Sequence, residues 1–139
     1  MNSNNLGILL NELKRFKESE KYFKRAVELN PAYFQAWNNL GTSLNKLGRL
    51  KEAKISFDRA IELSPGYTTA LNNRSKLLFD QKEFRLAIKD AEACNSEEAK
   101  ERILAALYAL GDSVEIQKRL KAYSETGVTN LRVAAFSSF

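Results

Sequence analysis

The sequence has no histidine and only one cysteine, Cys94, among its 139 residues. The absence of histidine excludes histidine general acid–base catalysis, Ser–His and Cys–His nucleophile pairs and most zinc sites. A single thiol can form neither an internal disulfide bond nor a cluster of thiolate ligands around a metal. We therefore expect a protein that is not an enzyme and that binds no cofactor and no metal.

Proline and glycine are also scarce, with 2 and 6 residues, which leaves little room for the many turns of an all-β fold. The longest apolar run, residues 103–110, has 8 residues, whereas a membrane-spanning helix needs about 20. Residues 1–5 are uncharged and mostly polar, unlike a secretory signal. The length is that of one domain. Since neither a membrane-spanning run nor a secretory signal is visible, we expect a cytoplasmic protein without membrane contact.

Basic residues exceed acidic ones only mildly, 22 against 17, which gives a net charge of +5. The densest basic stretch, residues 12–25, has glutamates mixed among its lysines and arginines. A nucleic-acid-binding surface more often has a basic stripe interleaved with aromatic residues. We therefore expect no nucleic-acid partner and interpret this stretch as the solvated face of a helix.

A repeat of 34 residues organises the chain. Residues 4–7, Asn-Asn-Leu-Gly, recur as residues 38–41 and more loosely as residues 72–75. Further positions keep the same offset: Leu10, Leu44 and Leu78; Ala26, Ala60 and Cys94; Pro31 and Pro65. Agreement at so many positions is typical of a repeat protein.

The pattern of each repeat predicts two helices. In the second repeat, apolar residues at helical spacing lead up to Gly48, and a second apolar stripe ends at residues 64–66, Ser-Pro-Gly. Gly41 and Ala53 are expected where the two helices approach closely, because larger side chains would push the helices apart. Three aromatic side chains are expected in the core: Phe23, Trp37 and Phe57. The sequence thus predicts an all-α fold.

The second repeat resembles the tetratricopeptide repeat family in its motif and its length. The family pattern W-x2-L-G-x2-Y, A-x3-F and P appears here as Trp37-x2-Leu40-Gly41-x2-Leu44, Ala53-x3-Phe57 and Pro65, with leucine in place of tyrosine. The resemblance implies a right-handed α-solenoid of about four helix-turn-helix repeats over residues 1–126. The units are expected at about 1–33, 34–67, 68–96 and 97–126, and residues 127–139 as a tail, a capping helix or the start of a further domain.

The fourth unit departs most from the pattern. About five residues are missing at its junction with the third unit, as the repeat offset there shortens from 34 to 29. Leu104 and Ile116 stand where the family has small residues. The helix spacing in this unit is therefore expected to differ from that in the second.

Residues that could do chemistry have structural explanations. Glu97 and Glu98 stand at a predicted helix start, where negative charge suits the helix dipole and Ser96 or Asn95 can serve as the cap. Cys94 occupies the position of Ala26 and Ala60, so we interpret it as a buried packing residue rather than a nucleophile.

Asparagine recurs at two adjacent positions of the first helix in the first three repeats. The column of Asn5, Asn39 and Asn73 resembles the asparagine ladder of the O-linked N-acetylglucosamine transferase and the peroxisomal import receptor. The resemblance implies that these side-chain amides hold the main chain of an extended peptide in a concave groove, since an amide offers both donors and an acceptor. The alternative is that the asparagines cap or bridge neighbouring helices.

Other polar residues at helical spacing are expected to line the same groove. The candidate peptide-binding residues are Asn5, Asn38, Asn39, Thr42, Asn45, Lys46, Asn72, Asn73 and Lys76. Because this lining is mildly basic, we expect a protein or peptide partner with some acidic character.

The carboxylate clamp of heat-shock co-chaperones is a sharper form of such a groove. It needs Lys and Asn in one repeat and Lys and Arg two repeats later, but Asn38, Thr42, Glu101 and Ala105 stand at those positions. Glu101 would repel a ligand carboxylate, so we reject the clamp.

The sequence therefore predicts a non-catalytic scaffold that binds an extended peptide. Two alternatives stay open. The chain could be the accessory repeat region of a larger enzyme whose catalytic domain lies beyond residue 139, or a solenoid that forms homo-oligomers through its open ends.

Overall fold

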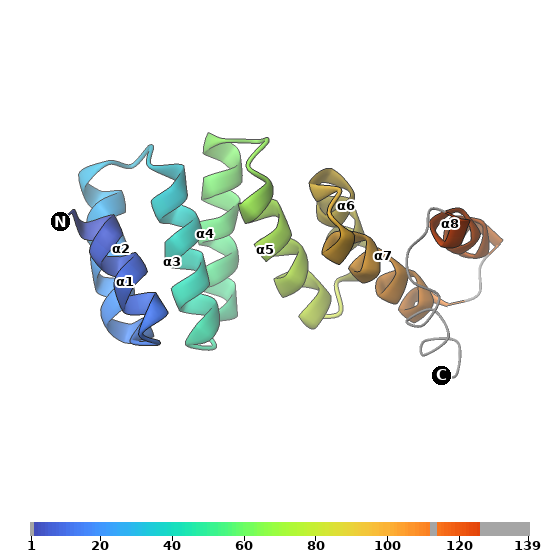
Figure 1. Ribbon diagram of the computed structural model, residues 1–139, viewed down its shortest axis with the longest axis horizontal. Helices are drawn as coiled ribbons and strands as arrows, with labels where there is room; N and C mark the ends of the chain where they lie inside the picture. The colour runs from blue at the N-terminus through green and yellow to red at the C-terminus, as the bar shows by residue number, and fades with distance from the viewer. Residues whose placement is uncertain (1, 112–113, 126–139) are drawn as a thin grey trace. The chain divides into compact units, whose positions relative to one another are not determined.

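The computed structural model describes residues 2–111 and 114–125, and within them every regular element is an α-helix (Figure 1). The helices are α1 (Ser3–Glu12), α2 (Phe16–Leu29), α3 (Phe34–Lys46), α4 (Leu50–Leu63), α5 (Thr68–Asp80), α6 (Phe84–Cys94), α7 (Glu97–Leu110) and α8 (Val114–Glu125). The predicted all-α fold, a solenoid of helical repeats, is confirmed. None of these described helices combines the length and the apolarity that a membrane crossing requires.

The chain divides into two compact units, residues 1–74 and 75–139, and the boundary falls inside α5. Each expected repeat contains one helix pair, from α1–α2 in the first to α7–α8 in the fourth. The domain bounds 1–126 stay a prediction, and the expected tail, residues 127–139, lies outside the described residues.

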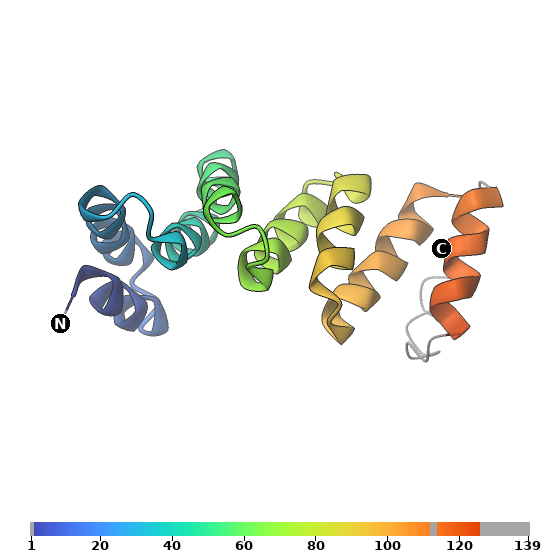
Figure 2. The same ribbon diagram turned by 90° about the horizontal axis from the view of Figure 1, so that it is seen from above.

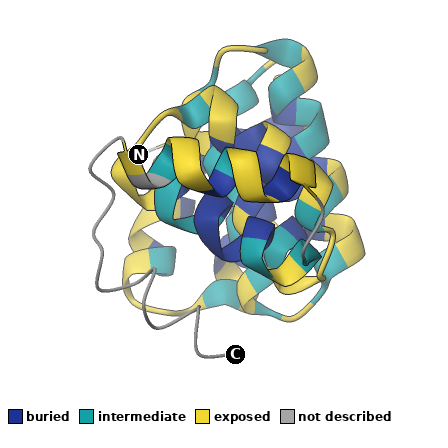
Figure 3. Ribbon diagram, turned by 90° about the vertical axis from the view of Figure 1, so that its right-hand side faces the viewer, coloured by how far each residue is buried: buried dark blue, intermediate teal, exposed yellow. Residues whose placement is uncertain are grey.

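Within the first unit the helices alternate between two rows. The first helices of the repeats, α1 and α3, lie in one row, and the second helices, α2 and α4, lie in the other (Figure 2). Figure 3, viewed from the side of α8, colours the described residues by burial, with buried residues toward the inside of the helix packing and exposed residues on outer surfaces. The two rows therefore offer two separate solvent-facing surfaces.

A tight turn joins the two helices of each of the first three pairs. Lys14, Gly48 and Lys82 occupy the same repeat position, and all three have a positive φ, of 58°, 78° and 63°. This left-handed conformation costs a side-chain-bearing residue about 1–2 kcal/mol and costs glycine almost nothing. Gly48 is therefore the residue best suited to this turn.

Small residues allow the paired helices of the first unit to approach closely. A Cβ atom on Gly41 would lie 2.6 Å from Phe57 Cε1, and one on Gly7 would lie 2.5 Å from Phe23 Cε1. Both phenylalanine rings are buried, as the sequence predicts. Trp37 differs from the expectation, because it is only half-buried and its indole Nε1 donates a hydrogen bond to the carbonyl of Pro31 at 2.8 Å.

The second unit is built around a core supplied by α6, α7 and α8. Leu104 and Ile116, which stand where small residues were expected, are both 2% exposed and belong to this core. In the third repeat, Ser75 replaces the glycine and Ala91 replaces the phenylalanine of the close contact seen in the first unit. Both replacements are buried, and the Ser75 hydroxyl donates to the carbonyl of Ala87 at 2.8 Å. A change at one position thus accompanies a change at the other.

Candidate functional site

Two hydrogen bonds join asparagines of neighbouring repeats. Asn39 Nδ2 on α3 donates to Asn4 Oδ1 on α1 at 3.0 Å, and Asn73 Nδ2 on α5 donates to Asn38 Oδ1 on α3, also at 3.0 Å. We call Asn4–Asn39 and Asn38–Asn73 the asparagine pairs. Both pairs lie in the first unit, and their identical pattern follows from the 34-residue repeat. The asparagines therefore do bridge neighbouring helices.

The two members of each pair differ in burial. Asn4 and Asn38 are only 5% and 3% exposed, whereas Asn39 and Asn73 are half-buried. Asn4 is engaged at both ends of its amide, because its Nδ2 also donates to the hydroxyl of Tyr33 at 3.0 Å. A buried amide that donates at its Nδ2 end and accepts at its Oδ1 end has one orientation, so it fixes the partner that it contacts.

The half-buried members keep unused bonding capacity. Asn39 gives one amide hydrogen to Asn4, and among the described residues its second hydrogen and its Oδ1 have no partner. The same holds for Asn73, which gives one hydrogen to Asn38. Each side chain thus retains one donor and one acceptor, in an orientation set by its buried neighbour.

The other candidates of the first unit lie on the same helices. Asn5 is exposed on α1, where the chain described here offers no earlier asparagine to pair with it. On α3, Thr42 is half-buried and its hydroxyl donates to the carbonyl of Asn38 at 3.1 Å. Asn45 is half-buried, and Lys46 is exposed with no ion-pair partner in the described part of the chain. We call the solvent-facing side of α1, α3 and α5 up to Arg74 the first-helix face.

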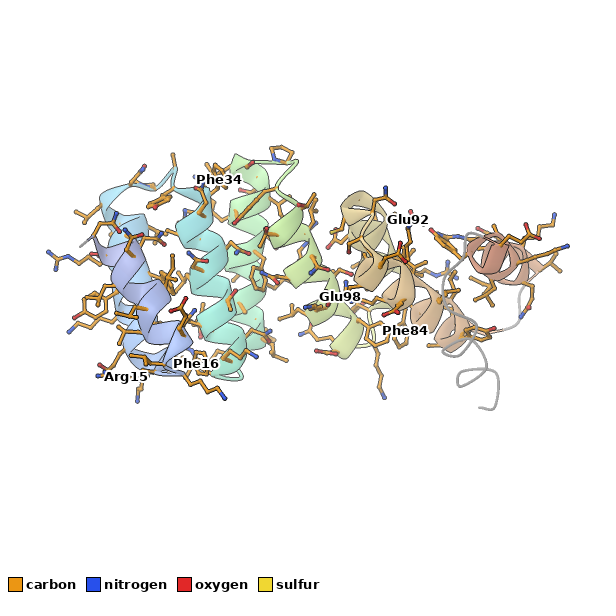
Figure 4. The ribbon with its side chains drawn as sticks, viewed as in Figure 1. Arg15, Phe16, Phe34, Phe84, Glu92 and Glu98 are labelled. Carbon is orange, nitrogen blue, oxygen red and sulfur yellow. The ribbon has the colours of Figure 1, made fainter. Side chains whose placement is uncertain are left out.

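The remaining candidates lie on α5. Asn72 is half-buried and belongs to the first unit with Asn73. Lys76 belongs to the second unit, is exposed, and forms a 2.7 Å ion pair with Glu98 of α7, which is labelled in Figure 4. Its charge is therefore already partly balanced within the fold.

The comparisons with known proteins agree with this geometry. A family model of the tetratricopeptide repeat matches residues 4–68, which contain both members of the first asparagine pair. Residues 4–68 are tetratricopeptide repeats. Such repeats generally serve as protein-interaction scaffolds.

The similarity of fold extends over more of the chain than the matched residues. A solved structure described as the crystal structure of MamA protein is similar over 90% of this chain and 71% of its own, with a TM-score of 0.80 and 22% identity. At this identity the similarity establishes the fold alone. Comparison with curated proteins finds no match to the sequence.

The residues that were considered for catalysis have structural roles at the end of α6 and the start of α7. Ser96 Oγ accepts a hydrogen bond from the backbone N–H of Ala99 at 3.1 Å, so it caps α7, and Glu97 and Glu98 lie in the first turn. Cys94 is half-buried rather than fully buried, and its Sγ donates to the carbonyl of Asp90 at 3.2 Å. Burial raises the pKa of the Cys94 thiol, which disfavours the nucleophilic thiolate.

Sequence reasoning missed an apolar residue on the first-helix face. Ile8 of α1 is 38% exposed and stands at the same repeat position as Thr42 and Lys76. The 34-residue offset from those two candidates could have identified it. The lining is therefore polar with an apolar contribution at its start.

Proposed function

We propose that the chain is a non-catalytic scaffold that binds an extended peptide of a partner protein along the first-helix face. The observation that supports this proposal is the unused donor and acceptor on Asn39 and on Asn73. We assign direct peptide contact to these two residues. Their buried partners, Asn4 and Asn38, hold the two amides in position.

The spacing of the repeats suits an extended ligand. Packed helices lie about 8–10 Å apart, and an extended chain advances about 3.3 Å per residue. One repeat therefore meets about three ligand residues, so that Asn39 and Asn73 contact main-chain groups at regular intervals. Main-chain contacts of this kind do not depend on the ligand side chains.

Side-chain contacts must supply the remaining affinity, because one hydrogen bond contributes only about 1 kcal/mol. Lys46 provides an exposed positive charge with no ion-pair partner among the residues described, and Ile8 provides apolar surface. The preferred peptide therefore combines an acidic side chain with an apolar one.

Selection from a random peptide library on the full 139-residue chain, followed by calorimetry, tests the proposal. Asn39→Ala and Asn73→Ala should each weaken binding by about 1–2 kcal/mol, which is about 5- to 30-fold. Asn30→Ala, in the turn between α2 and α3, is the matched control and should leave affinity unchanged. The proposal fails if the Asn39→Ala/Asn73→Ala double variant binds the selected peptides as tightly as the wild type.

A further inference from the structure

A basic hollow lies on α2. Helix α2 belongs to the row of second helices and so lies apart from the first-helix face (Figure 2). The volume of the hollow is about 620 Å³, and it is open to solvent. The lining residues are Lys17, Glu20, Lys21, Tyr22, Lys24, Arg25 and Glu28. All of them come from one helix of the first unit.

The positive charge of this hollow is only partly balanced. Glu20 is 9% exposed at its side chain and binds Lys24 at 2.9 Å and Arg49 of α4 at 2.5 Å, so its charge is already satisfied. Lys17, Lys21 and Arg25 have no ion-pair partner among the described residues. Among the lining residues that the structure describes, Glu28 is the one carboxylate left to oppose these three cations.

The next repeat provides an internal comparison. At the positions of Lys21 and Lys24, α4 has Ile55 and Asp58. Asp58 pairs with Lys54 and with Arg74, both at 3.0 Å. At the equivalent positions of α4, Lys54 pairs with Asp58 and Arg59 pairs with Glu62. Among the described residues these positions therefore leave one cation, Lys51, without an ion-pair partner, compared with three on α2.

A patch of this size does not fit a long polyanion. Nucleic acids and anionic membranes present repeated charges over a long distance, and their binding surfaces extend accordingly. The cations of α2 stop after two turns of one helix. A short acidic segment of a protein matches this extent.

The spacing of the unpaired cations defines the segment further. Lys17, Lys21 and Arg25 are four residues apart, so they form a stripe with a rise of about 6 Å from one to the next. In an extended peptide, alternate side chains point to the same side about 6.6 Å apart. Carboxylates at alternate positions can therefore each meet one cation of the stripe.

We propose that the α2 hollow binds a short extended peptide segment of a partner protein that carries acidic residues at alternate positions. Each carboxylate accepts charge-assisted hydrogen bonds from Lys17, Lys21 or Arg25, and Tyr22 adds apolar surface to the lining. This surface is independent of the first-helix face, so that one chain can hold two partner segments.

Two fluorescein-labelled peptides of equal composition test the spacing by fluorescence anisotropy at low ionic strength. One has the sequence Gly-Thr-Glu-Thr-Glu-Thr-Glu-Thr-Gly, and the other has its three glutamates in a block, Gly-Thr-Thr-Glu-Glu-Glu-Thr-Thr-Gly. The alternating peptide should bind about fivefold more tightly, and added salt should weaken its binding because these charges are exposed. Equal affinities would overturn the proposal.

Two charge-reversed variants test the location. Lys17→Glu/Arg25→Glu alters α2, and Lys51→Glu/Arg59→Glu alters the same repeat positions on α4 by the same net charge. The α2 variant should lose about tenfold in affinity and the α4 control less than about twofold, because the contact is local rather than a general effect of net charge. Equal losses in both variants would contradict the proposal.

Thermal melts establish that the variants fold, and Lys17→Gln/Arg25→Gln removes the same contacts with a smaller change in charge. A single-stranded oligothymidylate serves as the competing class of anion. If it binds more tightly than the alternating peptide, and the α2 variant abolishes that binding, the surface recognises a polyanion and the peptide proposal is wrong.

Discussion

Asn39 and Asn4, which are 35 residues apart, share a hydrogen bond of 3.0 Å between Nδ2 and Oδ1. The bond joins the first helices of two successive repeats. Asn73 and Asn38 form the same bond one repeat later. A pattern of paired asparagines therefore contributes to both the packing of the repeats and the orientation of the amides that face solvent. The two contributions can be separated by mutating one member of a pair at a time.

The asparagine pair is expected to contribute to stability. Asn4→Ala should cost about 1–3 kcal/mol, because it removes a buried, doubly bonded amide, and Asn39→Ala should cost about 1 kcal/mol. A double-mutant cycle by urea unfolding should show a coupling of about 0.5–1.5 kcal/mol. Strictly additive effects would mean that the observed hydrogen bond adds nothing to the fold.

Gly41 is expected to tolerate no side chain. In Gly41→Ala the new Cβ would lie 2.6 Å from the buried Phe57 ring, so overpacking should cost about 1–3 kcal/mol. Gly66→Ala is the matched control, because nothing lies within 4 Å of its added Cβ. The measurement is thermal unfolding. If the two variants had the same melting temperature, the assigned contact between Gly41 and Phe57 would be absent.

Gly48 should be sensitive for a different reason. A Cβ on Gly48 meets no atom within 4 Å, yet its φ of 78° lies in the left-handed region. Gly48→Ala should therefore lose about 1 kcal/mol in a urea melt, from backbone strain alone. A neutral substitution would indicate that the turn adopts another conformation.

Glu20 should make stability depend on pH. Burial by itself would raise the pKa of the Glu20 carboxyl, but hydrogen bonds from Lys24 and Arg49 and their charges lower it below its ordinary value of 4.5. A carboxyl whose pKa is lower in the folded state stabilises the fold above the unfolded-state pKa, and this stability is lost as the pH falls through the folded-state pKa.

The free energy of unfolding should therefore fall in acid below about pH 5, and Glu20→Gln should flatten this dependence. At neutral pH the variant should lose about 1–2 kcal/mol, since its partners are half-exposed. Glu28→Gln is the control, because Glu28 lies on the same helix and has no ion-pair partner in the part of the chain that the structure describes. A pH profile of Glu20→Gln that matched the wild type would contradict this role.

Much of the fold could be predicted because the 34-residue offset repeats each local feature. The pairing of Gly41 with Phe57, for example, follows from helix spacing within one repeat. The direction of the Asn39 amide could not be predicted, because it depends on how closely α3 approaches Asn4 in another repeat. The unpaired positive charge on α2 could not be predicted for the same reason. Arg49, which helps to balance the charge of Glu20, is 29 residues away in the sequence.

The side-chain amide resonances of Asn39 and Asn73 test the account most directly. A ¹⁵N-labelled sample should be titrated with a library-selected peptide, and the asparagine side-chain signals followed to saturation. The account predicts that the signals of Asn39 and Asn73 shift with the binding curve while the signal of Asn30 does not. Peptide binding that leaves both Asn39 and Asn73 unshifted would contradict it.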